Sequence, residues 1–430
     1  MAGIARSADT GQLMKTQIRP QNLEPAPCSA AVLRIGAPRR TPASLVLRSI
    51  DESEHLGFLL GRADPESVSF LQSPVWGRVK PAWRTESLGW FESGRLVGTA
   101  LVLYRDLPHV PLLGRRSLAY LPEGPTVDWF GSGRRATDWL DPLLAHLRAA
   151  GVFSVKMGPK LVGRAWDAAA VKLGMADPEI DVFGALPGAF RNDGASPRLV
   201  RELEALGWRR HGRRGDGIMD TQPRHFVRIR LNGRDRDAVH SELDQQWRRN
   251  TRIAERAGVE VWQGNAVDLP VFHGLYMETA RRDGFTPRPL PYFERMFREL
   301  RAAAPDGIRL YLAGVDGCTA GAAIMVRFGR HAWFAYGAST AERRELRPSN
   351  ALHWRMIQDC IADGIEFYDL RGVAETLDPR HPMYGLLRFK IGTGGEIVEY
   401  PGEYDLALVP ALDRAVRGWL LTVRPRLRLR

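Results

Sequence analysis

The sequence predicts an α/β protein built from two tandem domains of the same kind, each a mixed, twisted sheet flanked by helices. The chain has 430 residues, of which 44% are hydrophobic and 26% charged, so it can bury a sizeable core and is too long for one ordinary domain. Two distant stretches also share one order of elements: several strands, then a helix, then a glycine and a further strand.

The first of these stretches begins with a strand, a glycine-containing turn and a second strand over residues 89–105. A third strand is predicted within residues 117–129. Apolar residues then recur at helical spacing between Trp139 and Leu147, which predicts a helix with one buried face. Gly151 ends this helix, and the apolar run that follows it predicts a further strand.

The second stretch repeats this order. Strands are predicted within residues 309–339, and a helix is predicted over residues 349–363, with Ser349 or Asn350 as its cap. Gly364 and a last strand follow the helix. This is the order of elements in acetyltransferase-like (GNAT-type) domains, and its repetition predicts a duplicated pair of them.

The predicted domain boundaries follow from these two stretches. Residues 1–44 lack a sustained period and are expected to form a flexible leader. We expect the first domain to comprise residues 45–221 together with a C-terminal return over residues 400–430. The second domain is expected to comprise residues 222–399.

The chain is strongly basic, with a net charge of +12 and an isoelectric point near 10. This charge favours an anionic partner such as nucleic acid, a nucleotide or a lipid phosphate. Frequent use of arginine codons would give the same composition, so the charge alone does not establish an anionic partner. Residues 411–430 alternate arginine with apolar side chains, which is typical of a helix on an anionic membrane surface or of a docked helix with a basic end.

The cysteines and the apolar runs indicate the compartment. Cys28, Cys318 and Cys360 lack the spacing of a metal site and leave an odd thiol, which is typical of a reducing environment. Neither a membrane-spanning apolar run nor a signal-peptide core is present in the sequence. We therefore expect a cytoplasmic protein, in peripheral contact with the inner face of the membrane if its tail binds lipid, and no metal or cofactor.

Lys390 is the first catalytic candidate, because it is one of only six lysines in a chain that has 55 arginines. Lysine offers a compact charge that can lie beside a single developing oxyanion, whereas arginine offers a flat fork. The alternative is a lysine whose stem covers apolar surface while its ammonium remains in water.

An acyl-coenzyme A enzyme of this fold is the runner-up interpretation. Such enzymes hold the coenzyme A pyrophosphate on a glycine-rich turn at a helix N-terminus, where backbone N–H groups approach the phosphates. The corresponding turn of the second stretch reads RELRPSNALHW and contains no glycine, and Pro348 lacks an N–H donor. The fold is therefore predicted more strongly than acetyl-coenzyme A binding.

Seven short segments match one known family in order. They are FLQSPVWGRVK, AYLPEGPTVDW, RDGFTPRPLPYFERMF, WFAYGAS, FYDLRGV, LRFKIGTGG and EYPGEYD, between Phe70 and Asp405. In these segments the chain resembles the Fem family (FemX/FemAB type) of peptidoglycan interpeptide-bridge aminoacyltransferases. The resemblance implies two acetyltransferase-like domains and transfer of an amino acid from aminoacyl-tRNA to the stem peptide of a cell-wall precursor, either UDP-MurNAc-pentapeptide or lipid II. Because QQWRRNTRIAERAGVEV leads straight into a strand, the chain resembles the compact type without a helical-hairpin arm.

The resemblance also implies roles for individual residues. Lys80, Arg288, Tyr292 and Tyr336 match residues that contact the nucleotide-linked acceptor in compact relatives. Their chemistry fits, because a diphosphate requires cations and hydrogen-bond donors. Without the resemblance, Lys80 would be interpreted as a surface lysine and the tyrosines as core aromatic residues.

The Phe-Lys pair that the family uses in the transfer step corresponds to Phe389 and Lys390. An amine attacking the ester of aminoacyl-tRNA generates a tetrahedral oxyanion, which a preplaced ammonium stabilises, while the aromatic ring excludes water and orients the ester. The ester is already activated, so a covalent enzyme intermediate is not needed.

Three positions depart from the family pattern. Some relatives carry an acidic residue where this chain has Gly158, so a carboxylate base at that point is excluded and the substrates' own hydroxyl and phosphate groups are expected to carry the proton. Glu123 replaces the usual basic residue before Gly-Pro, and Arg371 stands where relatives often have glycine.

A possible tRNA contact lies outside these motifs. A predicted helix carries four arginines within two turns, Arg248, Arg249, Arg252 and Arg256, which suits either tRNA phosphates or a solvated helix face. A third interpretation of the whole chain is a non-catalytic protein of this fold that binds tRNA or an anionic lipid precursor.

Overall fold

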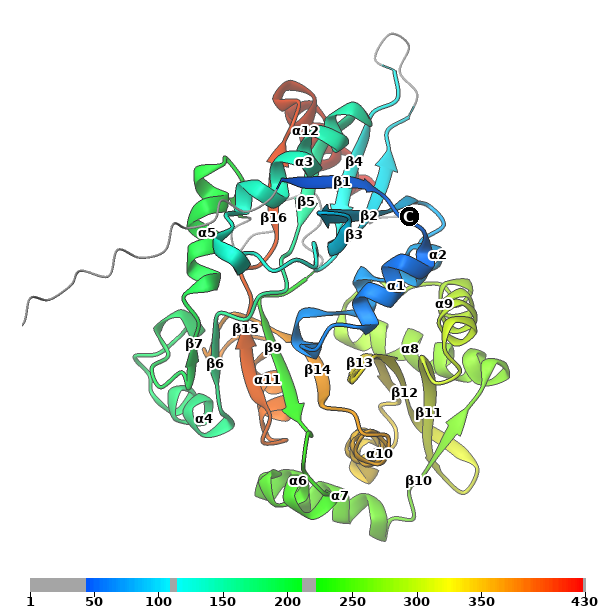
Figure 1. Ribbon diagram of the computed structural model, residues 1–430. Coiled ribbons are helices and arrows are strands. Elements are labelled where there is room, and N and C mark those ends of the chain that lie inside the picture. The colour runs from blue at the N-terminus through cyan, green and yellow to red at the C-terminus, as the bar shows by residue number, and fades with distance from the viewer. Residues whose placement is uncertain (1–43, 109–113, 211–221, 428–430) are drawn as a thin grey trace, which may run out of the picture. The chain divides into compact units, whose positions relative to one another are not determined.

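The described strands form two mixed sheets (Figure 1). The computed structural model describes residues 44–108, 114–210 and 222–427. Strands β1 to β4 pair antiparallel, β4 pairs parallel with β5, and β16 pairs antiparallel with β5 and β8. Within the described residues, the first sheet has the order β1 (Leu45–Ser49), β2 (Arg84–Glu92), β3 (Arg95–Asp106), β4 (Ser117–Leu121), β5 (Val152–Met157), β16 (Tyr404–Ala407) and β8 (Arg209–Arg210).

Local sequence signals explain this sheet. Ser93 and Gly94 have φ of 49° and 81°, the pair of left-handed residues that a tight hairpin requires, so β2 folds back onto β3. Helix α3 (Ala136–Ala149) then connects β4 with β5 and buries Trp139 and Leu143 against the sheet. A crossover helix of this kind is what allows two consecutive strands to run parallel.

The second sheet repeats the arrangement. Strands β10 to β13 pair antiparallel, and β13 pairs parallel with β14 after the connection through α10 (Pro348–Ala362). This confirms the predicted fold class of two repeated mixed sheets flanked by helices. Among the residues that the structure describes, the order is β10 (Glu260–Gly264), β11 (Ile308–Val315), β12 (Cys318–Phe328), β13 (His331–Ser339), β14 (Phe367–Val373), β9 (His225–Arg230), β15 (Glu396–Glu399), β6 (Arg164–Trp166) and β7 (Arg191–Asn192).

The start of α10 differs from the expectation. Its N-cap is Arg347, which has a left-handed backbone (φ 57°), and no side chain caps the helix. The prediction that Ser349 or Asn350 caps it is therefore wrong. Pro348, which has no N–H to satisfy, occupies the first helical position instead.

The first half of the chain contributes two strands to the second sheet. Strands β6 and β7 come from the segment assigned by sequence to the first domain, yet β6 pairs with β15 and extends the second sheet. Residues 42–430 accordingly form one compact unit. The predicted boundaries at residues 221 and 399 stay a prediction, and the predicted leader lies almost wholly outside the described residues.

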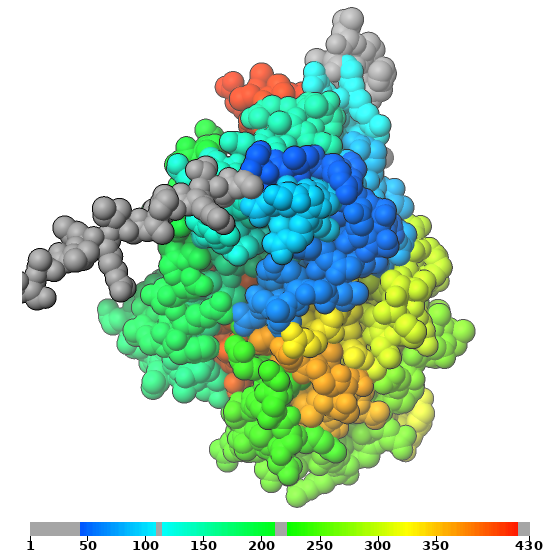
Figure 2. Space-filling model, in the orientation of Figure 1, coloured from blue at the N-terminus to red at the C-terminus, as the bar shows by residue number. Residues whose placement is uncertain are grey.

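Helices from both halves of the chain pack together beside the second sheet. Helix α2 packs against α9, and one buried cluster joins Phe70 and Trp76 to Phe293 and Trp333. In the space-filling view, the blue segment with α1 and α2 lies against the yellow segments of the second half (Figure 2). The further helices are α1 (Glu52–Leu60), α2 (Pro74–Val79), α4 (Ala168–Ala176), α5 (Ala195–Ala205), α6 (Arg236–Glu242), α7 (Gln245–Arg256), α8 (Leu269–Asp283), α9 (Leu290–Ala303), α11 (Tyr384–Ile391) and α12 (Pro410–Leu427).

The segment between α7 and β10 is short. Helix α7 ends at Arg256, Gly258 turns the chain with φ of 71°, and β10 begins at Glu260. A helical-hairpin arm has no room between these two elements. The predicted compact type is therefore confirmed.

The first part of α12 is docked on the first sheet. Arg417 binds Asp413 one turn earlier and Asp405 of β16, with N–O distances of 2.7 and 3.0 Å. None of the helices described here is both long and apolar enough to cross a bilayer. The membrane contact expected of the C-terminal tail stays a prediction.

Candidate active site

Four side chains predicted from the sequence to bind the acceptor line one cavity of about 420 Å³. We call it the tyrosine cavity. The four residues are Lys80, Arg288, Tyr292 and Tyr336. They come from the end of α2, the segment before α9, α9 itself and β13, and the packing of α2 against α9 brings the first two elements together.

Hydrogen bonds connect these side chains. The Lys80 ammonium donates to the Tyr292 hydroxyl over 3.3 Å, and the hydroxyls of Tyr292 and Tyr336 are 3.1 Å apart. Lys80 also lies 4.5 Å from the ring centre of Trp76, and the exposed Arg288 lies 4.7 Å from the ring centre of Tyr292. The aromatic faces therefore hold two cations at one cavity.

The electrostatics of the tyrosine cavity favour an anion. Burial lowers the pKa of Lys80 to about 7, and the positive charge of Arg288 lowers it further in the same direction. Burial likewise raises the pKa of Tyr292, so its hydroxyl keeps its proton and can donate it in a hydrogen bond. An incoming dianion would restore the charge of Lys80 and would accept bonds from both tyrosines.

Phe389 and Lys390 line a second cavity, of about 400 Å³, which we call the lysine cavity. Both residues lie in the last turn of α11. The other side of the cavity is formed by the N-terminal part of α10, including Arg347, Asn350 and His353. The Phe-Lys pair and the tyrosine cluster thus line two separate cavities, a separation that the sequence does not indicate.

Lys390 is held in place inside the protein. Its side chain is only 6% exposed, and its ammonium donates hydrogen bonds to the carbonyl oxygens of Gly372 (2.7 Å) and Arg371 (3.3 Å). Burial lowers the pKa of Lys390 to about 8, although the negative charge of Asp369 opposes that shift. Near neutral pH the group is therefore mainly an ammonium whose position is fixed by two main-chain oxygens.

Phe389 is fixed by its neighbours. The Trp247 indole N–H donates to the carbonyl oxygen of Phe389 over 2.6 Å, and the two rings pack with centres 4.7 Å apart. His353 lies 5.5 Å from the Phe389 ring and bonds the Tyr368 hydroxyl through Nδ1 at 2.8 Å. No local spacing in the sequence links His353 of α10 to Phe389 of α11.

The two cavities meet at a bulge in β14. The pairing of β14 with β9 shifts register between Asp369 and Gly372, and Arg371 within this shift has φ of 67°. Arg371 lines the tyrosine cavity with its side chain, and its carbonyl oxygen binds Lys390 of the lysine cavity. Arg371 therefore lines one cavity and hydrogen-bonds a residue that lines the other.

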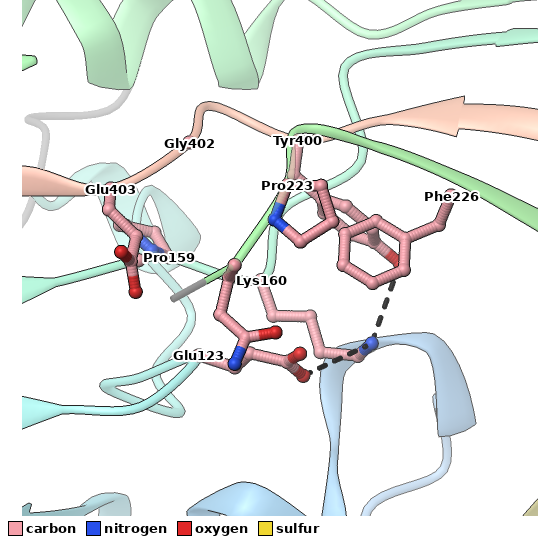
Figure 3. Close-up of a pocket in the computed structure, with 10 residues that line it drawn as sticks. Glu123, Pro159, Lys160, Pro223, Phe226, Tyr400, Gly402 and Glu403 are labelled. Carbon is pink, nitrogen blue, oxygen red and sulfur yellow. Dashed lines mark hydrogen bonds and ion pairs between the residues drawn. The ribbon is translucent and has the colours of Figure 1, made fainter. Parts of the chain in front are cut away.

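A third, much smaller pocket lies around Glu123, Lys160 and Tyr400 (Figure 3). Its volume of about 20 Å³ is the size of one water molecule, so it cannot admit a substrate group. Lys160 is buried and lies 3.6 Å from the Glu123 carboxylate and 3.5 Å from the Tyr400 hydroxyl. This pocket is a buried charge cluster beside the tyrosine cavity rather than a binding site.

The neighbourhood of Gly158 contains carboxylates that the sequence did not suggest. A side chain at Gly158 would meet Glu403, whose carboxylate accepts a hydrogen bond of 2.8 Å from the Tyr120 hydroxyl. Tyr120 in turn lines the tyrosine cavity. No signal in the sequence pairs these residues, because they lie 283 positions apart.

Comparison with known proteins identifies the family. The model of the FemAB family matches residues 62–316 and 313–417. The chain belongs to the FemAB family. Among its relatives are the lipid II:glycine glycyltransferases of Staphylococcus saprophyticus subsp. saprophyticus and of Staphylococcus aureus (strain MRSA252), each 23% identical over 88% of this chain and 96% of the relative.

A solved structure supports the fold assignment. The crystal structure of FemX matches with a TM-score of 0.69 and 19% identity, over 86% of this chain and 100% of that chain. The FemAB family assignment predicted from the seven segments is therefore confirmed, as is the predicted fold. The chain is accordingly an enzyme of the aminoacyltransferase class.

Proposed function

We propose that this FemAB-family enzyme adds an amino acid to the stem peptide of a peptidoglycan precursor, and that it takes the amino acid from an aminoacyl-tRNA. The relatives named as lipid II:glycine glycyltransferases support a peptidoglycan precursor as the acceptor. The bulge of β14 is the structural observation that carries the proposal. There, the ammonium of Lys390 is held by the carbonyl of Arg371, a residue that lines the neighbouring cavity.

The tyrosine cavity suits the phosphate end of the acceptor. Lys80 and Arg288 supply positive charge, and the hydroxyls of Tyr292 and Tyr336 supply hydrogen-bond donors 3.1 Å apart. None of the described residues that line the cavity is acidic, so the cavity would attract a diphosphate. The volume of about 420 Å³ is within the range of small-molecule sites.

The lysine cavity suits the ester end of the donor. The acceptor amine attacks the ester carbonyl, so that a C–N bond forms and the C–O bond to the ribose breaks. The intermediate carries its negative charge on the carbonyl oxygen, where the ammonium of Lys390 can stabilise it without reorganisation. Phe389, fixed by Trp247, excludes water from the ester.

The proton balance requires no protein base. The proton lost by the attacking nitrogen ends on the ribose oxygen that leaves with the tRNA. We propose that the hydroxyl and phosphate groups of the two substrates carry it, as the sequence suggests. No organic cofactor or metal enters this scheme, and aminoacyl-tRNA serves as co-substrate.

Positive charge around the lysine cavity suits the tRNA backbone. Arg282, Arg344 and Arg347 line this cavity and are exposed, and Asn250 of α7 lies at its edge. The arginines of α7 continue the charge along one helix, because Arg249, Arg252 and Arg256 follow one another at helical spacing. The affinity for tRNA should therefore fall steeply as the salt concentration rises.

We also propose a cytoplasmic location for the reaction. If the acceptor is lipid-linked, the arginines that the sequence has within residues 411–430 would bring the enzyme to the inner face of the membrane. Cosedimentation with anionic vesicles, with and without residues 420–430, tests this part separately.

Mass measurement of the product tests the proposed function. The enzyme is incubated with a mixture of charged tRNAs and either UDP-MurNAc-pentapeptide or lipid II. We expect a mass gain of one aminoacyl residue, which identifies the donor and the preferred acceptor. Tight, salt-sensitive binding of tRNA with no product from either acceptor would favour the non-catalytic interpretation instead.

The acyl-coenzyme A alternative is less well supported. The N-terminus of α10 begins with Pro348 and has Arg347 as its N-cap, so the glycine-rich turn that approaches a pyrophosphate is missing. Saturable binding of coenzyme A in a calorimetric titration would revive this alternative.

A further inference from the structure

Arg371 has a backbone conformation in which its carbonyl oxygen faces Lys390 while its side chain lines the tyrosine cavity. It lies in the β14 bulge with φ of 67°, and its N–H donates to the Asp369 carboxylate over 2.5 Å. Its carbonyl oxygen then points to the Lys390 ammonium, 3.3 Å away. A non-glycine residue in this conformation is strained, so the position keeps a side chain at a cost in stability.

The side chain of Arg371 lines the tyrosine cavity, where part of its guanidinium remains exposed. One terminal nitrogen donates to the amide oxygen of Gln222 over 2.9 Å. The other lies 3.6 Å from the Glu123 carboxylate, is buried from solvent and makes no hydrogen bond among the described residues, so it faces Glu123 and not the cavity. The guanidinium also lies 5.3 Å from the ring centre of Phe226 and remains 23% exposed.

The Glu123 carboxylate forms an ion pair with the Arg371 guanidinium. Its carboxylate lies between Arg371 and Lys160, at 3.6 Å from each, and is 8% exposed (Figure 3 shows the side toward Lys160). Because Lys160 is also buried, the carboxylate is kept in place by two cations. Arg371 is therefore oriented by the protein and does not depend on a ligand for its position.

The location of Arg371 limits what it can bind. Lys80, Tyr292 and Tyr336 form one hydrogen-bonded group, whereas Arg371 belongs to β14 and shares its main chain with the anchor of Lys390. An acceptor whose diphosphate lies on the first group would extend toward Lys390 with its peptide. The anionic groups of that peptide are carboxylates, which the planar fork of arginine recognises well.

We propose that Arg371 binds an oxyanion of the acceptor, a carboxylate of the stem peptide, and thereby determines where the acceptor amine arrives beside Lys390. The inference rests on the proposed function, because it takes the acceptor to be a peptidoglycan precursor. It assigns to Arg371 a role in acceptor specificity: the enzyme distinguishes precursors with free stem carboxylates from those in which they are amidated.

The test is a calorimetric titration of the enzyme with UDP-MurNAc-pentapeptide, in its free form and with its stem carboxylates amidated. We expect the wild type to bind the free form about 10- to 100-fold more tightly than the amidated form, which is the effect of one charge-assisted hydrogen-bonded pair. Arg371→Gly should lose this factor for the free form and bind both forms alike. Glycine adopts φ near 67° without strain, so the variant should fold, and its melting temperature checks this.

Arg380→Gly is the control. It removes the same side chain from an exposed position that lines neither cavity and pairs with Asp378, so acceptor affinity and discrimination should both be unchanged. Equal binding of both acceptor forms by the wild type and by Arg371→Gly would overturn the proposal. An equal loss for both forms and for UDP alone would also overturn it, because Arg371 would then bind the diphosphate.

A transfer assay separates this inference from the proposed function. Wild-type enzyme that discriminates between the acceptors but transfers no amino acid from any charged tRNA contradicts the proposed function alone. Wild-type enzyme that transfers, together with an Arg371→Gly variant whose KM ratio for the two acceptors is unchanged, contradicts this inference alone.

Discussion

The Lys390 ammonium donates a 2.7 Å hydrogen bond to the carbonyl oxygen of Gly372, and this bond ties the last turn of α11 to the bulge of β14. A lysine side chain in water samples many rotamers, whereas this one is held by two main-chain acceptors. The charge is therefore in position before any substrate arrives, as stabilisation of an oxyanion requires.

Replacing Lys390 with methionine should remove the charge and keep most of the apolar stem. We expect Lys390→Met to lower kcat by about 10²- to 10³-fold, the effect of losing one oxyanion donor, with little change in acceptor affinity. Single-turnover transfer and calorimetry measure the two quantities. Arg388→Met is the control, because Arg388 lies exposed on the same helix and should tolerate the change. A loss of acceptor binding in place of rate would contradict the role given to Lys390.

The rate should fall at high pH. Burial lowers the pKa of Lys390 to about 8, so the ammonium exists below that pH and is lost as the pH rises through it. We expect kcat to decline above about pH 8, with a tenfold fall per unit once the group is neutral. The residual activity of Lys390→Met should lack this decline. A profile of the variant that falls in the same way as the wild type would assign the decline to another group.

The parts of this enzyme that could be predicted from sequence are those that depend on local sequence patterns. The repeated order of strands, helix and glycine predicts both sheets, because periodicity and turn residues act within about twenty positions. Exchange of β6 and β7 into the second sheet could not be predicted in this way, since the pairing of Ile397 with Trp166 joins residues far apart in the chain.

The same distinction applies to the site. Lys80, Tyr292 and Lys390 lie in recognisable motifs, and the structure places them in cavities. The motifs could not show that Arg371 lines the tyrosine cavity and also accepts a hydrogen bond from Lys390. That arrangement depends on a bulge in which Arg371 has φ of 67°, and no sequence pattern predicts a left-handed backbone at an arginine. The interpretation of Arg371 from sequence was limited to a departure from glycine.

Binding of the acceptor should be coupled to protonation of Lys80. Its pKa of about 7 in the free enzyme means that it is mostly neutral at pH 8, and a bound diphosphate would raise that pKa. We expect the enzyme to take up protons on binding at pH 8, seen as a calorimetric enthalpy that depends on the ionisation heat of the buffer. Affinity should fall as the pH rises above 7.

Two lysine variants check this coupling. Lys80→Met should abolish the proton uptake and weaken acceptor binding by about 10- to 100-fold, since it removes a charge-assisted contact. Lys172→Met should change neither, because Lys172 is 41% exposed and pairs with Asp244 on the surface. Proton uptake that persists in Lys80→Met would place the titrating group elsewhere.

The buried pair of Lys160 and Glu123, beside the tyrosine cavity, should make a large contribution to the free energy of unfolding. Burial alone would lower the pKa of Lys160, but Tyr400 and Glu123 outweigh it and the pKa is raised, so the stabilisation is fully present below about pH 10.5 and is lost only above that pH. Lys160→Met removes one of the two cations beside the buried Glu123 carboxylate, leaving Arg371, and should lower the free energy of unfolding by about 3 kcal/mol. The double variant Lys160→Met with Glu123→Gln should recover most of that loss, because neither charge of the pair remains.

Urea unfolding between pH 6 and 9 measures the stability of the wild type, the single variant and the double variant. Because Lys160 keeps its charge throughout this range, the difference in unfolding free energy between wild type and Lys160→Met should stay constant. A double variant as unstable as Lys160→Met alone would show that the lysine stabilises the fold through its packing and not through Glu123.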